Sequence, residues 1–329
     1  MWNPSMKPKL LGRTGVSVSE LCFGTMSFGG DADEATSAAM YKAVRDAGIN
    51  FFDTANEYNK GVSEEILGRL AKGDRNDLVI TTKVNAQIRP DTNARGTSRR
   101  HVVEAIEGCL RRLQTDRIDV LFLHRYDALT PIDESMRGLE DLVRAGKVIY
   151  PAVSNWSAWQ TQRAVDIQDH NNWARLQVIQ PMYNLVKRQA EVELLPMAAA
   201  NGIGVIPYSP GAAGLLSGKY LGQASGRLTA NKMYEARYGD PWMFEVAEKY
   251  AAFCKQKGLH PVTTAIAWVA SHPAVTAPII GARNLDQLKD SLAAVNMNMT
   301  PELRAEIAEL SRTPPPATDR SEEQRVVKS

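Results

Sequence analysis

The chain contains eight short apolar runs, separated by longer segments with more polar residues. The runs cover residues 21–24, 49–52, 78–82, 118–123, 148–153, 178–180, 204–207 and 277–280. Most of them are nearly continuous in hydrophobicity and do not alternate with polar residues, which is typical of parallel strands covered by helices. The pattern therefore predicts a parallel sheet of eight strands.

Helical periodicity is found between the apolar runs. It predicts helices within residues 35–47, 102–113, 135–145 and 192–200, each ahead of the next run. Another helix is expected to end at Gly258, because an apolar stripe precedes this glycine; the stripe consists of Val246, Tyr250, Phe253 and Cys254. Pro261 suits the start of a further helix. Eight strand and helix units in a chain of 329 residues favour an α/β fold of the (β/α)8 TIM barrel type over an open sheet.

Three segments fall outside the repeating pattern. Residues 10–19 predict a β-hairpin with an Arg-Thr-Gly turn, which we expect to cap the bottom of the barrel. Residues 221–240 form the longest irregular stretch and predict a mobile lid. We expect residues 1–312 to form one barrel domain and residues 313–329, which begin with Pro-rich sequence, to form a flexible tail.

Composition and charge exclude several classes of protein. Thirty-nine Lys and Arg residues against 37 Asp and Glu residues leave a net charge of +2, so no large basic field is available for nucleic acid. No apolar stretch approaches the roughly 18 residues of a membrane span, and the N-terminus does not resemble a signal peptide, so we expect a cytoplasmic protein. Cys22, Cys109 and Cys254 are widely spaced, which predicts buried thiols without disulfides or a metal clamp.

Polar residues follow three of the predicted strands directly. Asp53, Lys83 and His124 each close an apolar run, and active sites of (β/α)8 barrels lie at the carboxyl ends of the strands. Tyr58 follows Asp53 by five residues. Each of the four has an ordinary structural explanation by itself, as a turn cap, a rim residue, a snorkelling chain or a core histidine. Together they are more informative, because a lysine and an aspartate in one barrel mouth are costly unless they pair.

An Asp-Lys pair beside a tyrosine has a chemical use. The ammonium of Lys83 would stabilise the phenolate of Tyr58 and lower its pKa from the usual value of about 10, which would make the phenol a general acid at neutral pH. Neutral His124 could donate a second hydrogen bond to the same oxygen and polarise a carbonyl group. The four residues therefore predict a site for carbonyl reduction.

The chain resembles the aldo-keto reductases over nearly its whole length. The motifs that carry the resemblance are Gly24-Thr25-Met26, Asp53-Thr54-Ala55 with Tyr58, Ser63-Glu64-Glu65-Ile66-Leu67-Gly68, Thr82-Lys83, Leu123-His124, Gly146-Lys147, Val153-Ser154-Asn155-Trp156, Gln180 and Tyr208-Ser209-Pro210. The resemblance implies a catalytic tetrad of Asp53, Tyr58, Lys83 and His124, with Tyr58 as proton donor and hydride from nicotinamide C4. Hydride transfer of this kind needs no metal. His124 favours carbonyl reduction, because relatives that reduce steroid double bonds carry an acidic residue there.

The resemblance also implies a binding site for NADPH, with NADH less favoured. Ser154, Asn155 and Gln180 would bind the nicotinamide carboxamide. Residues 209–214 would form a loop whose backbone amides bind the pyrophosphate. Arg283 would suit a 2′-phosphate. Ser291 departs from the asparagine of many relatives. The full predicted set is Gly24, Thr25, Met26, Asp53, Ser154, Asn155, Gln180, Tyr208, Ser209, Pro210, Gly211, Ala212, Gly214, Lys219, Arg227, Gly281, Arg283, Gln287, Asp290 and Ser291.

The expected partner is a small aldehyde or ketone. Its pocket is predicted to comprise Met26, Phe28, Tyr58, His124, Arg125, Tyr126 and Trp156, together with the lid residues Tyr234, Tyr238 and Trp242. Aromatic surfaces of this kind suit sugar-like or cyclic carbonyls. The branch of the family that the chain resembles most includes bacterial reductases related to the potassium-channel β subunits. An oligomer is possible.

Two alternatives to an ordinary reductase stay open at the level of sequence. The first is a subunit that binds NADPH tightly, turns over slowly and reports the redox state to a partner. The second is a lysine-dependent aldolase, since Lys83 could form a Schiff base, although pairing with Asp53 should keep the amine protonated. The chain has no P-loop, no GxGxxG after a first strand, and no GxSxG or HExxH motif.

Overall fold

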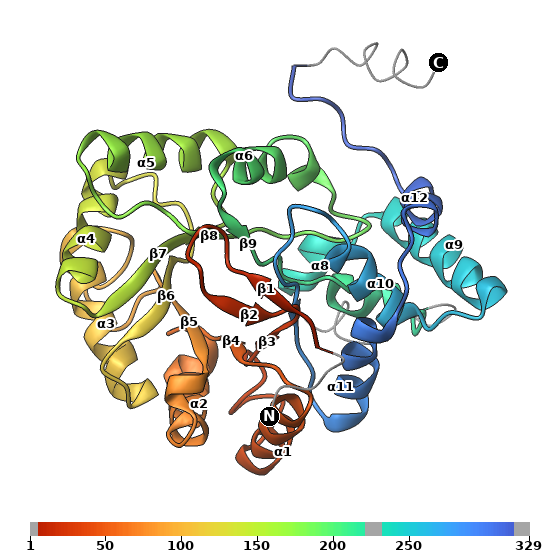
Figure 1. Cartoon of the computed structure of the whole chain (residues 1–329), viewed down its shortest axis with the longest axis horizontal. Coiled ribbons are helices and arrows are strands. Elements are labelled where there is room, and N and C mark those ends of the chain that lie inside the picture. Colours follow the sequence, from red (N-terminus) through yellow and green to blue (C-terminus); the bar gives the residue numbers. More distant parts are fainter. Residues whose placement is uncertain (1–5, 221–231, 319–329) are drawn as a thin grey trace.

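The computed structural model describes residues 6–220 and 232–318, and within them eight parallel strands form one curled sheet (Figure 1). The neighbours in this sheet follow the order β10-β3-β4-β5-β6-β7-β8-β9. The strands are β3 (Cys22–Gly24), β4 (Phe51–Asp53), β5 (Val79–Val84), β6 (Ile118–Leu123), β7 (Val148–Ser154), β8 (Val178–Gln180), β9 (Gly204–Val205) and β10 (Ile279–Ile280). Each of them coincides with a predicted apolar run.

The two edges of the sheet are joined by backbone hydrogen bonds. The amide of Thr276 donates to the carbonyl of Val205 at 2.8 Å, and the amide of Ile279 donates to the carbonyl of Pro207 at 2.8 Å. These bonds connect the β9 segment to the β10 segment, so the eight strands close on themselves. The predicted (β/α)8 barrel is confirmed.

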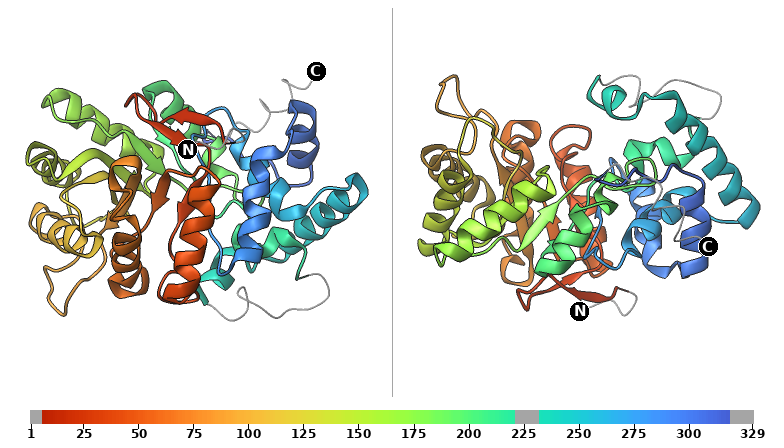
Figure 2. Two further views of the ribbon diagram at one scale, coloured as in Figure 1. Left: turned by 60° about the horizontal axis from the view of Figure 1, so that its bottom comes forward. Right: turned by 90° about the horizontal axis from the view of Figure 1, so that it is seen from above.

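Helices surround the sheet on its outer face (Figures 1 and 2). They are α1 (Glu34–Asp46), α2 (Val62–Ala71), α3 (Arg99–Leu113), α4 (Ile132–Arg144), α5 (Ala158–His170), α6 (Leu194–Asn201), α8 (Lys232–Tyr238), α9 (Pro241–Lys257), α10 (Pro261–Ala270), α11 (Leu285–Leu292) and α12 (Pro301–Glu309). Short 3-10 turns are η1 (Tyr58–Gly61), η2 (Arg75–Asp77), η3 (Gln189–Glu191), η4 (Ala212–Ser217) and η5 (Ala293–Asn296). The predicted end of α9 is confirmed, because Gly258 adopts the left-handed conformation with φ 66°.

The N-terminal hairpin closes one end of the barrel. Its strands β1 (Pro8–Leu10) and β2 (Ser17–Ser19) pair antiparallel, and Figure 1 shows them across the middle of the barrel. Leu11 is fully buried and belongs to the apolar cluster inside the barrel. Gly12 has φ +55°, and a Cβ there would lie 2.6 Å from the amide nitrogen of Gly204, at the start of β9. The predicted cap at the amino ends of the strands is confirmed.

Two predictions about the remaining segments need qualification. The predicted irregular lid is wrong for residues 232–238, which form α8; Tyr234 and Tyr238 lie one helical turn apart and both are buried. Residues 221–231 lie outside the described residues. Residues 313–318 contain no helix or strand, and the rest of the predicted tail is not described. The domain boundary at residue 312 stays a prediction.

Two further properties follow from the described structure. Cys22, Cys109 and Cys254 are buried and free, as predicted, and burial raises the pKa of each thiol. Among the helices formed by residues 6–220 and 232–318, none is both long and apolar enough to cross a lipid bilayer.

Candidate active site

The barrel brings the four predicted catalytic residues together at the carboxyl ends of adjacent strands. Asp53 ends β4, Lys83 lies near the end of β5, and His124 directly follows β6. Tyr58 begins η1, in the loop after β4. This loop is fixed to its neighbour because the side chain of Asn59 donates hydrogen bonds to the backbone carbonyls of Met26 and Phe28, at 3.0 and 2.7 Å.

Lys83 is the centre of the site. Its side chain is completely buried, and its ammonium donates to Asp53 Oδ2 at 2.6 Å, to the Thr54 carbonyl at 2.7 Å and to the Tyr58 hydroxyl at 3.1 Å. An ammonium has three protons to donate, and each has an acceptor here. Burial alone would lower the pKa of Lys83, but Asp53 and Tyr58 raise it above its usual value, so the amine is charged.

The second oxygen of Asp53 is also saturated. Oδ1 accepts hydrogen bonds from Thr81 Oγ1 at 2.7 Å and from Gln180 Nε2 at 2.8 Å. These two donors and Lys83 compensate the buried carboxylate. Gln180, which we expected at the nicotinamide carboxamide, therefore also holds Asp53 in place.

The pKa of Tyr58 differs from the expectation. Burial is the largest influence and raises it, while Lys83 lowers it and Asp53 raises it further, so the net direction is above the usual value. The predicted net lowering is wrong for this structure, because removal of the phenol from water outweighs the attraction of the ammonium. The phenol consequently holds its proton firmly at neutral pH.

His124 lies beside Tyr58 with their rings edge to face and the centroids 6.1 Å apart. Burial, together with the positive charges of Lys83 and Arg125, lowers the pKa of His124 to about 2. The expected neutral imidazole agrees with this shift. Glu57, which we had not predicted, lies 3.1 Å from His124 Nδ1 and accepts a hydrogen bond from Arg125 at 2.7 Å.

A cavity of about 560 Å³ opens over these residues. The predicted cofactor residues that line it are Gly24, Met26, Asp53, Ser154, Asn155, Gln180, Tyr208, Ser209, Pro210, Gly211, Gly214, Lys219, Gly281, Arg283, Gln287, Asp290 and Ser291. Thr25 and Ala212 do not line it, because both are completely buried in the surrounding loops. Arg227 lies outside the described residues.

Near the tetrad, hydrogen bonds fix the polar groups of the cavity wall. Ser154 Oγ donates to the carbonyl of Gln180 at 2.9 Å, and Asn155 Nδ2 donates to the carbonyl of His124 at 3.0 Å. Tyr208 donates to Asn155 Oδ1 at 2.7 Å. This network orients the Tyr208 ring at the cavity wall.

The cavity wall also contains small residues and cations. A Cβ at Gly211 would meet no atom within 4 Å, and a Cβ at Gly281 would meet only the Gly24 carbonyl, at 3.8 Å. Lys219 and Arg283 line the cavity as well. Open backbone next to cations fits phosphate groups, so the shape and charge of the cavity are compatible with a dinucleotide phosphate.

The predicted substrate pocket is only partly reproduced. Met26, Tyr58, His124 and Arg125 line the cavity, and so does Tyr234. The other predicted residues have different neighbours. The ring of Phe28 packs against Phe23 and that of Tyr126 against Trp156, with centroids 5.9 and 5.2 Å apart. Tyr238 is hydrogen-bonded to Asn184 at 3.1 Å, and the Trp242 ring lies under the guanidinium of Arg312. Direct contact with substrate is therefore not supported for Phe28, Tyr126, Trp156, Tyr238 or Trp242.

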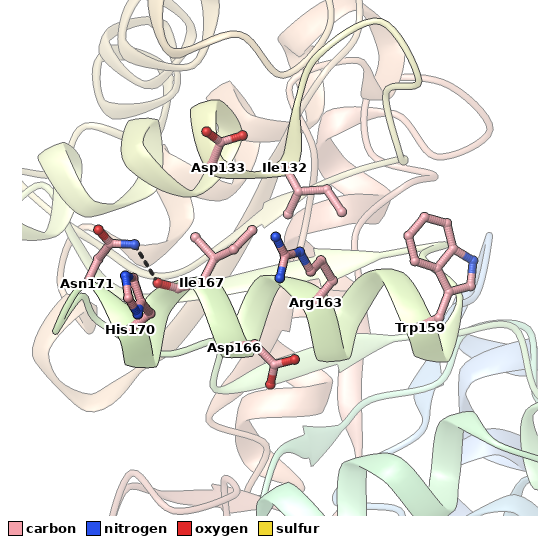
Figure 3. Close-up of a pocket in the computed structure, with 8 residues that line it drawn as sticks. All are labelled: Ile132, Asp133, Trp159, Arg163, Asp166, Ile167, His170 and Asn171. Carbon is pink, nitrogen blue, oxygen red and sulfur yellow. Dashed lines mark hydrogen bonds between the residues drawn. The ribbon is translucent and has the colours of Figure 1, made fainter.

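A larger cavity, about 800 Å³, lies on the outside of the barrel between α4 and α5 (Figure 3). Trp159 and Asn171 mark its two ends along α5, and the Asn171 side chain donates to the carbonyl of Ile167 at 2.8 Å. Its two acidic residues, Asp133 and Asp166, are exposed, and neither forms an ion pair among the described residues. The candidate active site is therefore the smaller cavity at the carboxyl ends of the strands.

The fold and the site define a barrel enzyme of the oxidoreductase class. The chain belongs to the aldo/keto reductase family, because the Aldo/keto reductase family matches residues 20–312. The chain is 39% identical to an uncharacterized oxidoreductase, YrpG, of Bacillus subtilis, over 91% of this chain and 94% of the relative. It is 34% identical to a probable voltage-gated potassium channel subunit beta of rice, over 95% and 99% of the two chains. It is also 32% identical to versiconal hemiacetal acetate reductase of Aspergillus parasiticus, over 89% and 93%.

Proposed function

We propose that this protein is an NADPH-dependent reductase that converts an aldehyde or ketone to an alcohol. The observation that carries the proposal is the pair of hydrogen bonds from the buried Lys83 ammonium, at 2.6 Å to Asp53 and at 3.1 Å to the partly buried Tyr58. The protonated phenol and the neutral imidazole of His124 both face the cavity. The proposal includes a small carbonyl compound as the partner of the protein, no nucleic-acid partner, and a cytoplasmic location.

The residues of this chain would act on the carbonyl oxygen. Bound NADPH would supply the hydride from C4 of its nicotinamide. Tyr58 would donate its proton to the oxygen, and the ammonium of Lys83 would stabilise the phenolate that remains. Asp53 would hold Lys83 in position, and neutral His124 would offer a second hydrogen bond to the same oxygen.

In this proposal, each part of NADPH is bound by particular groups of the cavity wall. Ser154, Asn155 and Gln180 would bind the carboxamide, and Tyr208 would stack on the nicotinamide ring. The backbone around Gly211 would accept the pyrophosphate. Support comes from the position of all five at the cavity and from the match of residues 20–312, which include them, to the Aldo/keto reductase family.

The proposal is tested by the loss of NADPH absorbance with a panel of aldehydes, ketosugars, cyclic ketones and quinones. NADH is measured in parallel. We expect rapid oxidation of NADPH with at least one class of carbonyl and slower oxidation of NADH. No turnover with any carbonyl, despite demonstrable binding of NADPH, would contradict the proposal.

The pH profile of kcat/KM is expected to be flat from pH 6 to 9 and to fall only at higher pH. His124 stays neutral throughout because its pKa is lowered to about 2, so it adds no acid limb. Tyr58 must be protonated to donate, and because burial raises its pKa, activity is lost only as the pH rises above the usual tyrosine value of about 10. The measurement is the initial rate across this range. A decrease of kcat/KM with a midpoint near pH 6.5 would contradict this expectation.

Arg283→Gln is expected to raise KM for NADPH by roughly 10- to 100-fold, the range of a lost charged hydrogen bond, with kcat nearly unchanged. The guanidinium lines the cavity and is 37% exposed, which leaves it accessible to a 2′-phosphate. NADH lacks that phosphate and serves as the internal control. An equal rise of KM for both cofactors would show that Arg283 does not bind the 2′-phosphate.

A second candidate function is a slow redox-sensing subunit. The observation in its favour is the identity of 34 to 36% to plant proteins named as probable potassium-channel β subunits. Cofactor that remains bound through purification, combined with turnover far below about one per second, would favour this function over an ordinary reductase.

A further inference from the structure

Arg237, on α8, lies at the mouth of the active-site cavity. Its guanidinium carbon is 5.9 Å from the ring centroid of Tyr208 and 5.9 Å from that of Tyr234. The side chain is half-buried and lines the cavity. Because Tyr208 is hydrogen-bonded to Asn155, this position places the positive charge at the end of the cavity that contains the tetrad.

Within residues 6–220 and 232–318, no carboxylate forms an ion pair with Arg237 and no hydrogen bond satisfies its guanidinium. The other cations at this end are neutralised: Lys83 by Asp53 at 2.6 Å, and Arg125 by Glu57 at 2.7 Å. A half-buried charge without a counter-ion is costly. The cost is understandable if an anion from solution completes the site.

The charge of Arg237 reaches the reacting groups. It contributes to the lowered pKa of His124 and opposes the rise in the pKa of Tyr208 that burial causes. Glu57 would not repel an anion strongly, because its carboxylate is paired with Arg125. The field at the cavity mouth is therefore positive.

We propose that Arg237 binds an anionic group, a carboxylate or a phosphate, on the carbonyl substrate. The planar guanidinium matches the oxygen pairs of both groups with two parallel hydrogen bonds. The substrate class is then a small aldehyde or ketone with an anionic substituent at some distance from its carbonyl carbon. This inference rests on the proposed reductase function and specifies its substrate.

The test compares substrates that differ only in the anion. 4-Carboxybenzaldehyde is paired with benzaldehyde, and glyceraldehyde 3-phosphate with glyceraldehyde, so that the two pairs distinguish carboxylate from phosphate. In Arg237→Met we expect kcat/KM for the anionic member of at least one pair to fall roughly 10- to 100-fold, the range of a lost charge-assisted pair. The neutral members should change less than about threefold.

Two further variants separate recognition from folding. Arg237→Lys keeps the charge and should recover part of the lost kcat/KM for the anionic substrate. Arg163→Gln removes an exposed arginine from α5, outside the active-site cavity, and should leave both members of each pair unchanged. Thermal denaturation of all variants checks that α8 remains packed.

Several results would overturn the inference. An equal loss for neutral and anionic substrates would assign Arg237 a general structural role. A weaker affinity for NADPH in Arg237→Met, measured by calorimetry, with unchanged discrimination between substrates would assign it to the cofactor.

Failure of the reductase function would be recognised separately, as no turnover of any of the four aldehydes, anionic or neutral, by the unaltered protein. Binding of benzoate against benzamide to the NADP⁺ complex would then decide the role of Arg237. Weaker binding of benzoate alone in Arg237→Met would support the inference, and equal binding in both proteins would overturn it.

Discussion

Tyr58→Phe is expected to lower kcat for carbonyl reduction by roughly 10²- to 10⁴-fold, the range of a lost general acid. The substitution removes one oxygen, whose only hydrogen bond among the described residues is with Lys83. The ring keeps its edge contact with His124, so the packing of the site is preserved. Because the phenol would act on the carbonyl oxygen and not on the cofactor, affinity for NADPH should stay within about twofold of the unaltered protein.

The measurement combines steady-state oxidation of NADPH with titration of NADPH binding. Tyr150→Phe is a matched control: Tyr150 lies on β7, and its hydroxyl makes no hydrogen bond within the described structure. This control should keep full activity. Activity of Tyr58→Phe equal to that of the unaltered protein would remove Tyr58 as the acid, and a large loss of NADPH affinity would mean that the phenol serves the cofactor.

The fold was largely predictable because its strands are continuous apolar runs. Even β9 and β10, with two residues each, lie within predicted runs, since burial on both sides of a parallel strand is visible in composition. Helix α5 was not predicted, although its capping box of Ser157 and Gln160 is a sequence signal. Helix α8 was missed because the glycines and polar residues around it suggested a loop.

The site was predictable where strand ends determine it. Asp53, Lys83 and His124 meet because parallel strands of a barrel end at one face. Side-chain direction is less predictable in loops and in a short helix, where little periodicity defines it: Phe28, in a loop, is buried in the core, and Arg237, on α8, lines the cavity. The direction of the Tyr58 pKa shift was missed for a related reason, because it depends on how much water the packing removes.

Lys83→Met is expected to lower the free energy of unfolding by about 3 to 5 kcal/mol, the cost of breaking a buried ion pair. The substitution fills similar space but removes the ammonium, so Asp53 would keep a buried charge with only Thr81 and Gln180 as donors. Carbonyl reduction should also be lost, because nothing would stabilise the phenolate of Tyr58. Urea denaturation and NADPH oxidation measure the two effects.

A double variant distinguishes the electrostatic cost from general damage to the core. Asp53→Asn combined with Lys83→Met leaves no unpaired charge, so it should recover most of the lost stability while activity remains absent. Arg112→Met breaks another ion pair, in which Glu64 is completely buried and 2.7 Å from Arg112, but which lies outside the cavity. It should lose stability and keep kcat. A double variant as unstable as Lys83→Met would mean that Lys83 stabilises the barrel through its packing and not through its charge.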